Sequence, residues 1–131
     1  MKRNAFKMKL KPGFEEEYKR RHDEIWPELR EELSKAGVSD YSVYLDAETL
    51  ILFAFQKLSD DHTSDDLPHK AIVQKWWAYM ADIMETNPDH SPVCIPLKEV
   101  FHGLIYSHEG TKNSKMKSMS FVSSCLRGER I

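Results

Sequence analysis

The sequence has little of what marks a disulfide-rich, metal-binding or membrane protein. It contains only two cysteines, Cys94 and Cys125, and its six histidines do not occur at the spacing of a zinc site. No apolar run approaches the roughly 20 residues of a membrane-spanning helix, and the first residues lack the apolar segment of a secretory signal. We therefore expect a cytoplasmic protein with reduced thiols, no bound metal and no membrane contact.

The sequence also lacks the glycine-rich phosphate loop of a nucleotide site and the GxSxG motif of a hydrolase nucleophile, and we expect no cofactor. A formal net charge of −2 gives no electrostatic reason to bind nucleic acid. The charge is uneven, because residues 103–131 contain five of the 19 basic and only two of the 21 acidic residues. We predict one domain over 1–102 and a tail of unassigned role over 103–131, which could be mobile, a swapped arm or non-native sequence.

Hydrophobic periodicity predicts a β-α-β-β-α-β order for the domain. Apolar residues alternate in the expected strands and recur at steps of three and four in the expected helices. The strands should cover residues 4–10, 40–46, 50–56 and 95–102, and the helices about 14–36 and 72–84. This order is typical of the α+β ferredoxin-like fold, a four-stranded antiparallel sheet with two helices on one face.

The other face of such a sheet has no helices to cover it. The segment 50–56 is apolar almost throughout, so both of its faces need to be buried. A second copy of the chain is the simplest cover, and we therefore predict a homodimer.

Pro27 interrupts the first predicted helix. A proline inside a helix costs about 3 kcal/mol, whereas in the first turn its missing amide hydrogen is not needed. We therefore expect a kink or a restart near Trp26, with a redirected second part that begins at Pro27.

His22 is the first candidate for chemistry. An isolated histidine on a helix is most often solvated or satisfied in the core. His22 shares a helical stripe with Tyr18 and Ile25, however, so it should face the sheet, with Tyr18 one turn before it. A histidine in a partly enclosed aromatic site can transfer protons near neutral pH, because its unperturbed pKa is about 6.5.

Four further aromatic residues have an ordinary and a functional interpretation. Trp76 and Trp77 point about 100° apart on their helix, so both can be core residues, or one can reach the edge of a pocket. An indole at a pocket edge suits the C–H face of a sugar ring. Tyr41 and Tyr44 lie on opposite faces of their strand, and alternation does not decide which one faces the helices.

Four segments together resemble the L-rhamnose mutarotase family: YKRRHDEIWPEL at 18–29, YSVYLD at 41–46, QKWWAYMADIM at 74–84 and NPDHSP at 87–92. The resemblance covers about residues 2–102. It implies a dimeric ferredoxin-like α/β barrel that interconverts the α and β anomers of L-rhamnose, an isomerase of cytoplasmic rhamnose metabolism that needs no cofactor. The chain departs from the family at His90, where an asparagine is expected, and in the divergent segment 58–70.

The resemblance also implies the roles of single residues. The general acid falls on His22, and the substrate-binding positions fall on Tyr18, Tyr41, Trp76 and Trp77. Two other classes of function remain open for the same fold. One is a non-catalytic carbohydrate-binding or regulatory module, and the other is a small monooxygenase.

Overall fold

The computed structural model of the protein describes residues 1–103, and residues 1–98 form one compact unit. Of the tail expected over 103–131, only Gly103 lies within the described residues, so the separate tail stays a prediction. No helix within residues 1–103 is long and apolar enough to cross a membrane.

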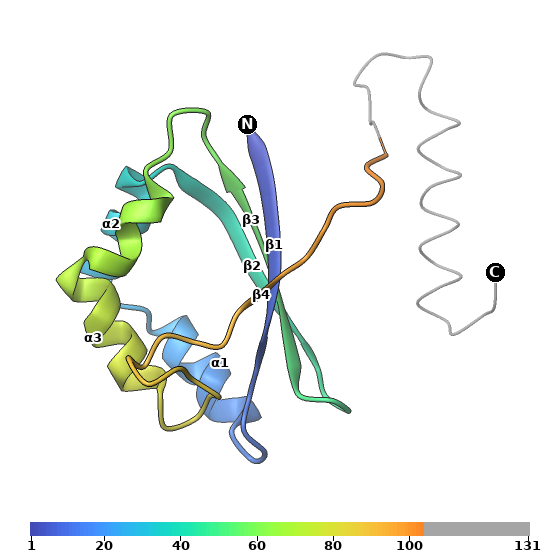
Figure 1. Ribbon diagram of the computed structural model, residues 1–131. Coiled ribbons are helices and arrows are strands. Elements are labelled where there is room, and N and C mark those ends of the chain that lie inside the picture. The colour runs from blue at the N-terminus through green and yellow to red at the C-terminus, as the bar shows by residue number, and fades with distance from the viewer. Residues whose placement is uncertain (104–131) are drawn as a thin grey trace. The chain divides into compact units, whose positions relative to one another are not determined.

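Four antiparallel strands form a sheet in the order β2-β3-β1-β4, and the helices lie on one side of it (Figure 1). The strands are β1 (Lys2–Lys9), β2 (Val38–Asp46), β3 (Ile51–Leu58) and β4 (Ile95–Pro96). The helices are α1 (Glu15–Asp23), α2 (Pro27–Lys35) and α3 (Ala71–Met80), with a 3₁₀ turn η1 (Ser64–His69) before α3. The α+β ferredoxin-like prediction is confirmed, including the antiparallel hairpin of β2 and β3.

The first predicted helix is in fact two helices. α1 ends at Asp23, and α2 begins at Pro27 after Trp26, whose backbone is extended with ψ 132°. The proline ring pushes the residue before it towards an extended conformation, and the first amide of a helix has no partner within that helix. The expected restart at Pro27 is therefore confirmed.

Two elements are shorter than their apolar patterns predicted. α3 ends at Met80, whereas the pattern of buried residues continues to Met84 in the turn that follows. The strand predicted over 95–102 covers only Ile95–Pro96. The Leu97 amide still donates to the carbonyl oxygen of Ala5 at 2.9 Å, but the strand ends at Pro96, which has no amide hydrogen for the ladder.

β2 carries a bulge at Asp40. Val38 pairs with Leu58 and Val43 pairs with Ala54, so β2 has one residue more than β3 between these two pairs. Asp40 is the extra residue, and its φ of +49° lies in the left-handed region. Because of the bulge, Val38 and Val43 both point to the side of the helices although an odd number of steps separates them.

The bulge yields a prediction about stability. Asp40→Val should lower the free energy of unfolding by about 1–2 kcal/mol, because a β-branched side chain clashes in the left-handed region. Asp40→Asn should stay within about 0.5 kcal/mol of the wild type, since asparagine tolerates this conformation and the exposed pair with Lys57 contributes little. Urea unfolding measures both variants, and equal stabilities would contradict the bulge.

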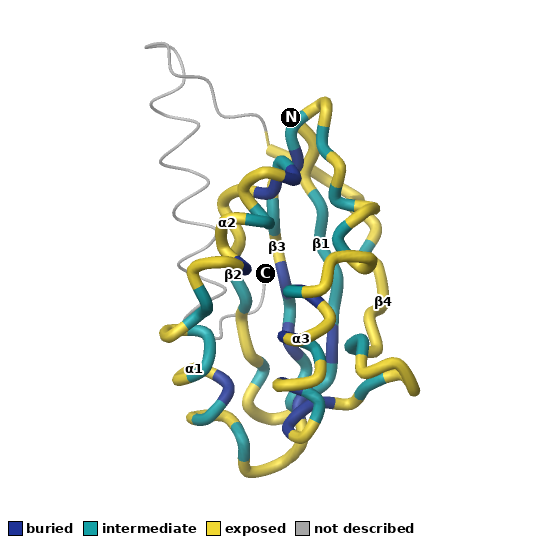
Figure 2. The backbone as a smooth tube through the Cα atoms, turned by 90° about the vertical axis from the view of Figure 1, so that its left-hand side faces the viewer, coloured by how far each residue is buried: buried dark blue, intermediate teal, exposed yellow. Residues whose placement is uncertain are grey.

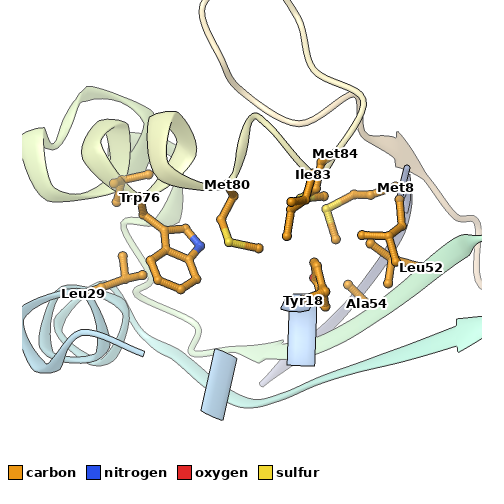
Figure 3. Close-up of a cluster of buried hydrophobic side chains, with 11 residues drawn as sticks. Met8, Tyr18, Leu29, Leu52, Ala54, Trp76, Met80, Ile83 and Met84 are labelled. Carbon is orange, nitrogen blue, oxygen red and sulfur yellow. The ribbon is translucent and has the colours of Figure 1, made fainter. Parts of the chain in front are cut away.

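The core lies between the helices and the face of the sheet that they cover, which we call the inner face (Figure 2). In Figure 3, the indole of Trp76 lies between Leu29 of α2 and Met80 of α3. The buried core residues are Met8, Leu10, Tyr18, Leu29, Leu52, Ala54, Val73, Trp76, Met80, Ile83 and Met84. This core fixes the tryptophan-bearing turn of α3 against the sheet.

The opposite, outer face of the sheet carries exposed aromatic side chains. Tyr44 is 63% exposed and Phe55 is 42% exposed, and their rings meet edge to face at 5.8 Å. Ile95 of β4 is also half exposed. Among the described residues, no helix covers this face (Figure 1).

Candidate active site

A cavity of about 1060 Å³ lies between the helices and the inner face of the sheet. All five residues singled out in the sequence line it: Tyr18, His22, Tyr41, Trp76 and Trp77. They come from α1, β2 and α3, which are far apart in the sequence. The structure thus brings the predicted residues to one place. Their roles remain to be tested.

The backbone of α1 itself orients His22. Its Nδ1 lies 3.1 Å from the carbonyl oxygen of Tyr18, one turn earlier. A carbonyl oxygen only accepts, so Nδ1 carries the hydrogen and donates it, and Nε2 has no hydrogen-bond partner among the described residues. The imidazole also stacks on the Tyr18 ring at 4.2 Å and meets the edge of Trp76 at 5.3 Å. These contacts fix both the tautomer and the plane of the ring.

Burial sets the protonation states of the site. It lowers the pKa of His22 below its usual value, against the smaller opposite effects of the Tyr18 carbonyl and the Asp23 carboxylate. At neutral pH the imidazole is therefore mainly neutral, with a lone pair on Nε2. Burial also raises the pKa of Tyr18 and raises that of Tyr41 to about 12, so both hydroxyls stay protonated and can donate hydrogen bonds.

The two tryptophans, for which the sequence left a core and a pocket interpretation open, differ in burial. Trp76 is 9% exposed and also contacts Trp26 edge to face at 5.1 Å. Trp77 is only partly buried at the wall of the cavity. Trp76 therefore belongs both to the core and to the cavity wall, so neither of the two interpretations excludes the other.

The structure also decides between the two tyrosines of β2. Tyr41 faces the cavity and meets Phe6 edge to face at 6.4 Å, whereas Tyr44 lies on the outer face. Although 42% of Tyr41 is accessible, the walls of the cavity surround its hydroxyl closely enough to raise its pKa. Tyr41 shares the parity of Val43 on the inner face, and the Asp40 bulge lets Val38 face the same side.

Two polar residues of the cavity were not identified from the sequence. Asn4 of β1 and Gln56 of β3 are direct partners in the ladder, and both line the cavity. Neither amide has a hydrogen-bond partner within the described residues. The strand alternation could have identified Asn4, because it shares the parity of Phe6 and Met8. His90, where the chain departs from the family, also lines the cavity, and its φ of +72° lies in the left-handed region.

The comparisons with known proteins identify the family. The family model for L-rhamnose mutarotase matches residues 3–103. The chain belongs to the L-rhamnose mutarotase family. An L-rhamnose mutarotase of Bacteroides thetaiotaomicron is 69% identical over 102 residues, which cover 78% of this chain and 98% of that protein. The corresponding protein of Phocaeicola vulgatus is 65% identical with the same coverage.

A solved structure agrees with the family assignment. The crystal structure of an L-rhamnose mutarotase from Formosa agariphila has a TM-score of 0.75 and 55% sequence identity. It covers 79% of this chain and 100% of that one. These mutarotase relatives support the isomerase prediction and favour neither the binding module nor the monooxygenase. Within residues 1–103, no three His, Cys, Asp or Glu side chains gather as metal ligands.

The lowered pKa of His22 predicts a pH effect on stability. In the unfolded chain His22 binds a proton near pH 6.5. In the folded chain burial lowers its pKa, so protonation requires a lower pH. The free energy of unfolding should therefore fall as the pH drops below about 6.5, and it should fall less steeply in His22→Gln. Urea unfolding from about pH 7.5 to about pH 5.5 measures this slope.

The control is His69→Gln, which changes an exposed histidine of η1 and should keep the wild-type slope. A wild-type slope in His22→Gln would show that burial does not disfavour the imidazolium.

Proposed function

We propose that this member of the L-rhamnose mutarotase family interconverts the α and β anomers of L-rhamnose by proton transfer through His22. Family membership supports the substrate and the reaction. The observation that carries the catalytic role is the geometry of His22, which lines the cavity. Its Nδ1 is bound to a backbone carbonyl, and its Nε2 has no hydrogen-bond partner among the described residues.

Mutarotation opens the pyranose ring to an aldehyde and closes it on the other face of C1. Opening removes a proton from the anomeric hydroxyl, breaks the bond between C1 and the ring oxygen, and delivers a proton to that oxygen. Both oxygens are bonded to C1, so one nitrogen that faces C1 can serve both. The neutral Nε2 accepts the first proton and returns it to the ring oxygen as the bond breaks. Closure is the reverse, and His22 is thus base and acid in turn.

The cavity must hold the rest of the sugar while C1 stays free to rotate about the bond to C2. The indoles of Trp76 and Trp77 suit the C–H face and the methyl group of a 6-deoxy sugar. The protonated hydroxyls of Tyr18 and Tyr41 supply donors, as the family resemblance implies. We add the amides of Asn4 and Gln56 as partners for sugar hydroxyls, because these amides have no protein partner among the described residues.

His22→Ala should lose anomer exchange on L-rhamnose by about 10²–10⁴-fold, the usual contribution of a positioned acid–base group. Saturation-transfer NMR between the two anomeric signals measures the exchange rate above the uncatalysed background. His69→Ala, which removes an exposed histidine, should keep the wild-type rate. Wild-type exchange in a folded His22→Ala protein would refute the role of His22.

We also infer that the protein forms a homodimer through the outer face, closing the two sheets into the α/β barrel that the resemblance implies. The exposed side chains of Tyr44, Phe55 and Ile95 support this inference, because apolar surface of this kind is normally covered.

We infer a cytoplasmic location from the thiol of Cys94, which forms no disulfide within the described residues.

Phe55→Glu should convert the dimer to a monomer, since it places a charge in the apolar contact between the two sheets. Light scattering at micromolar concentration measures the mass. The control Ser34→Glu adds the same charge to the exposed surface of α2 and should leave the dimer intact. A wild-type chain that is strictly monomeric would rule out the dimer itself.

A further inference from the structure

α1 carries His22 and Tyr18 but has little apolar packing of its own. Tyr18 is the only buried residue among its nine residues. Its other side chains are mostly charged, and many of them pair within the helix, as Lys19 does with Asp23. Exposed pairs of this kind contribute about 0–1 kcal/mol each and do not fix a helix in space. Another contact must hold α1 at a defined distance from the rest of the site.

Arg21 makes that contact. Its side chain is only 10% exposed and reaches past the end of α3. Nη1 donates to the carbonyl oxygen of Tyr79 at 2.7 Å and to Oδ1 of Asp82 at 2.8 Å. Nη2 donates to Oδ2 of Asp82 at 3.3 Å, and Nε donates to Glu17 of α1 at 2.7 Å. The guanidinium also lies 4.5 Å from the centre of the Tyr79 ring.

The two ends of this contact are next to the site. Arg21 precedes His22 directly in α1, and Tyr79 lies one helical turn after Trp76 in α3. His22 and Trp76 themselves meet edge to face at 5.3 Å. The guanidinium therefore joins the backbone that carries the proton-transfer group to the backbone that carries the wall of the cavity.

We propose that Arg21 is the positioning residue of the site: by binding the Tyr79 carbonyl and the Asp82 carboxylate together, it sets the distance between His22 on α1 and Trp76 on α3. This inference rests on the proposed role of His22. Arg21 itself lies outside the lining of the cavity, so it acts on the sugar only through the position of His22.

The chemistry of the contact requires arginine. A planar guanidinium can bind both oxygens of one carboxylate and a carbonyl at the same time, whereas the ammonium group of lysine is a single point. The contact also persists over a wide pH range. The two arginines beside Glu17 lower its pKa to about 2, and the Arg21 guanidinium lowers the pKa of Asp82.

A matched pair of carboxylates isolates the contact between the helices. Asp82 and Glu24 each lie 2.8 Å from an arginine of α1, and each has 65% of its side chain exposed. Glu24 binds Arg20 at the end of the same helix, however, whereas Asp82 lies beyond α3. Asp82→Asn and Glu24→Gln therefore remove equal charges, and only Asp82→Asn weakens the link between α1 and α3.

The test measures anomer exchange of L-rhamnose against sugar concentration in four variants. Arg21→Met should lower kcat by about 10–100-fold with KM within about threefold, since misplacement by about 1 Å can cost 10²-fold. Asp82→Asn should lower kcat about 3–10-fold, Arg21→Lys should recover part of the loss, and Glu24→Gln should stay within about twofold. The ring-proton NMR signals of His22 should shift in the first two variants, because the Tyr18 and Trp76 rings surround it.

The outcomes separate this inference from the proposed function. If His22→Ala is inactive but Arg21→Met and Asp82→Asn match Glu24→Gln in kcat, the positioning role is wrong and the catalytic role of His22 stands. If His22→Ala is fully active, both are wrong. Should Arg21→Met fail to fold, Asp82→Asn decides by itself, because it keeps the guanidinium and its bond to the Tyr79 carbonyl.

Discussion

The pleat of the sheet is the constraint on which the site depends. Alternate residues of a strand point to opposite faces, and the helices cover only one of these faces (Figure 1). Asn4, Gln56 and Tyr41 therefore reach the cavity because their parity matches that of the core residues. On β2, Tyr41 shares the parity of Val43, and the bulge at Asp40 brings Val38 to the same face. The alternation that turns Val43 to the core thus also places a substrate-binding candidate on the inner face.

In the helix layer, α1 is short and mostly charged, and it must still be held at a fixed distance from the core. Pro27 separates α1 from α2, so the packing of Leu29 in α2 does not fix α1 directly. The Tyr18 side chain anchors α1 from the inside, and the Arg21 guanidinium ties it to the end of α3. Tyr18 lies one turn before His22, and Arg21 directly precedes it, so both contacts hold the part of α1 that carries His22.

Much of the fold followed from the sequence because its signals are local. Alternation identified the strands, helical spacing identified the helices, and Pro27 marked the break between α1 and α2. Nothing local marks the end of α3, because Met84 stays buried in the turn that follows the helix. The resemblance named the five aromatic and histidine candidates. The contact of Arg21 could not be identified from the sequence, because its partner Asp82 is distant along the chain.

The bond that orients His22 has a consequence for local motion. The acceptor of Nδ1 is the Tyr18 carbonyl, a part of the α1 backbone that also lies one helical turn before the His22 amide. When the last turn of α1 frays, the carbonyl turns away and the imidazole is free to change tautomer and to rotate. A molecule with a frayed turn therefore loses the orientation of His22, even though the sheet and α3 remain folded. The tautomer and the plane of the imidazole therefore depend on the helicity of one turn.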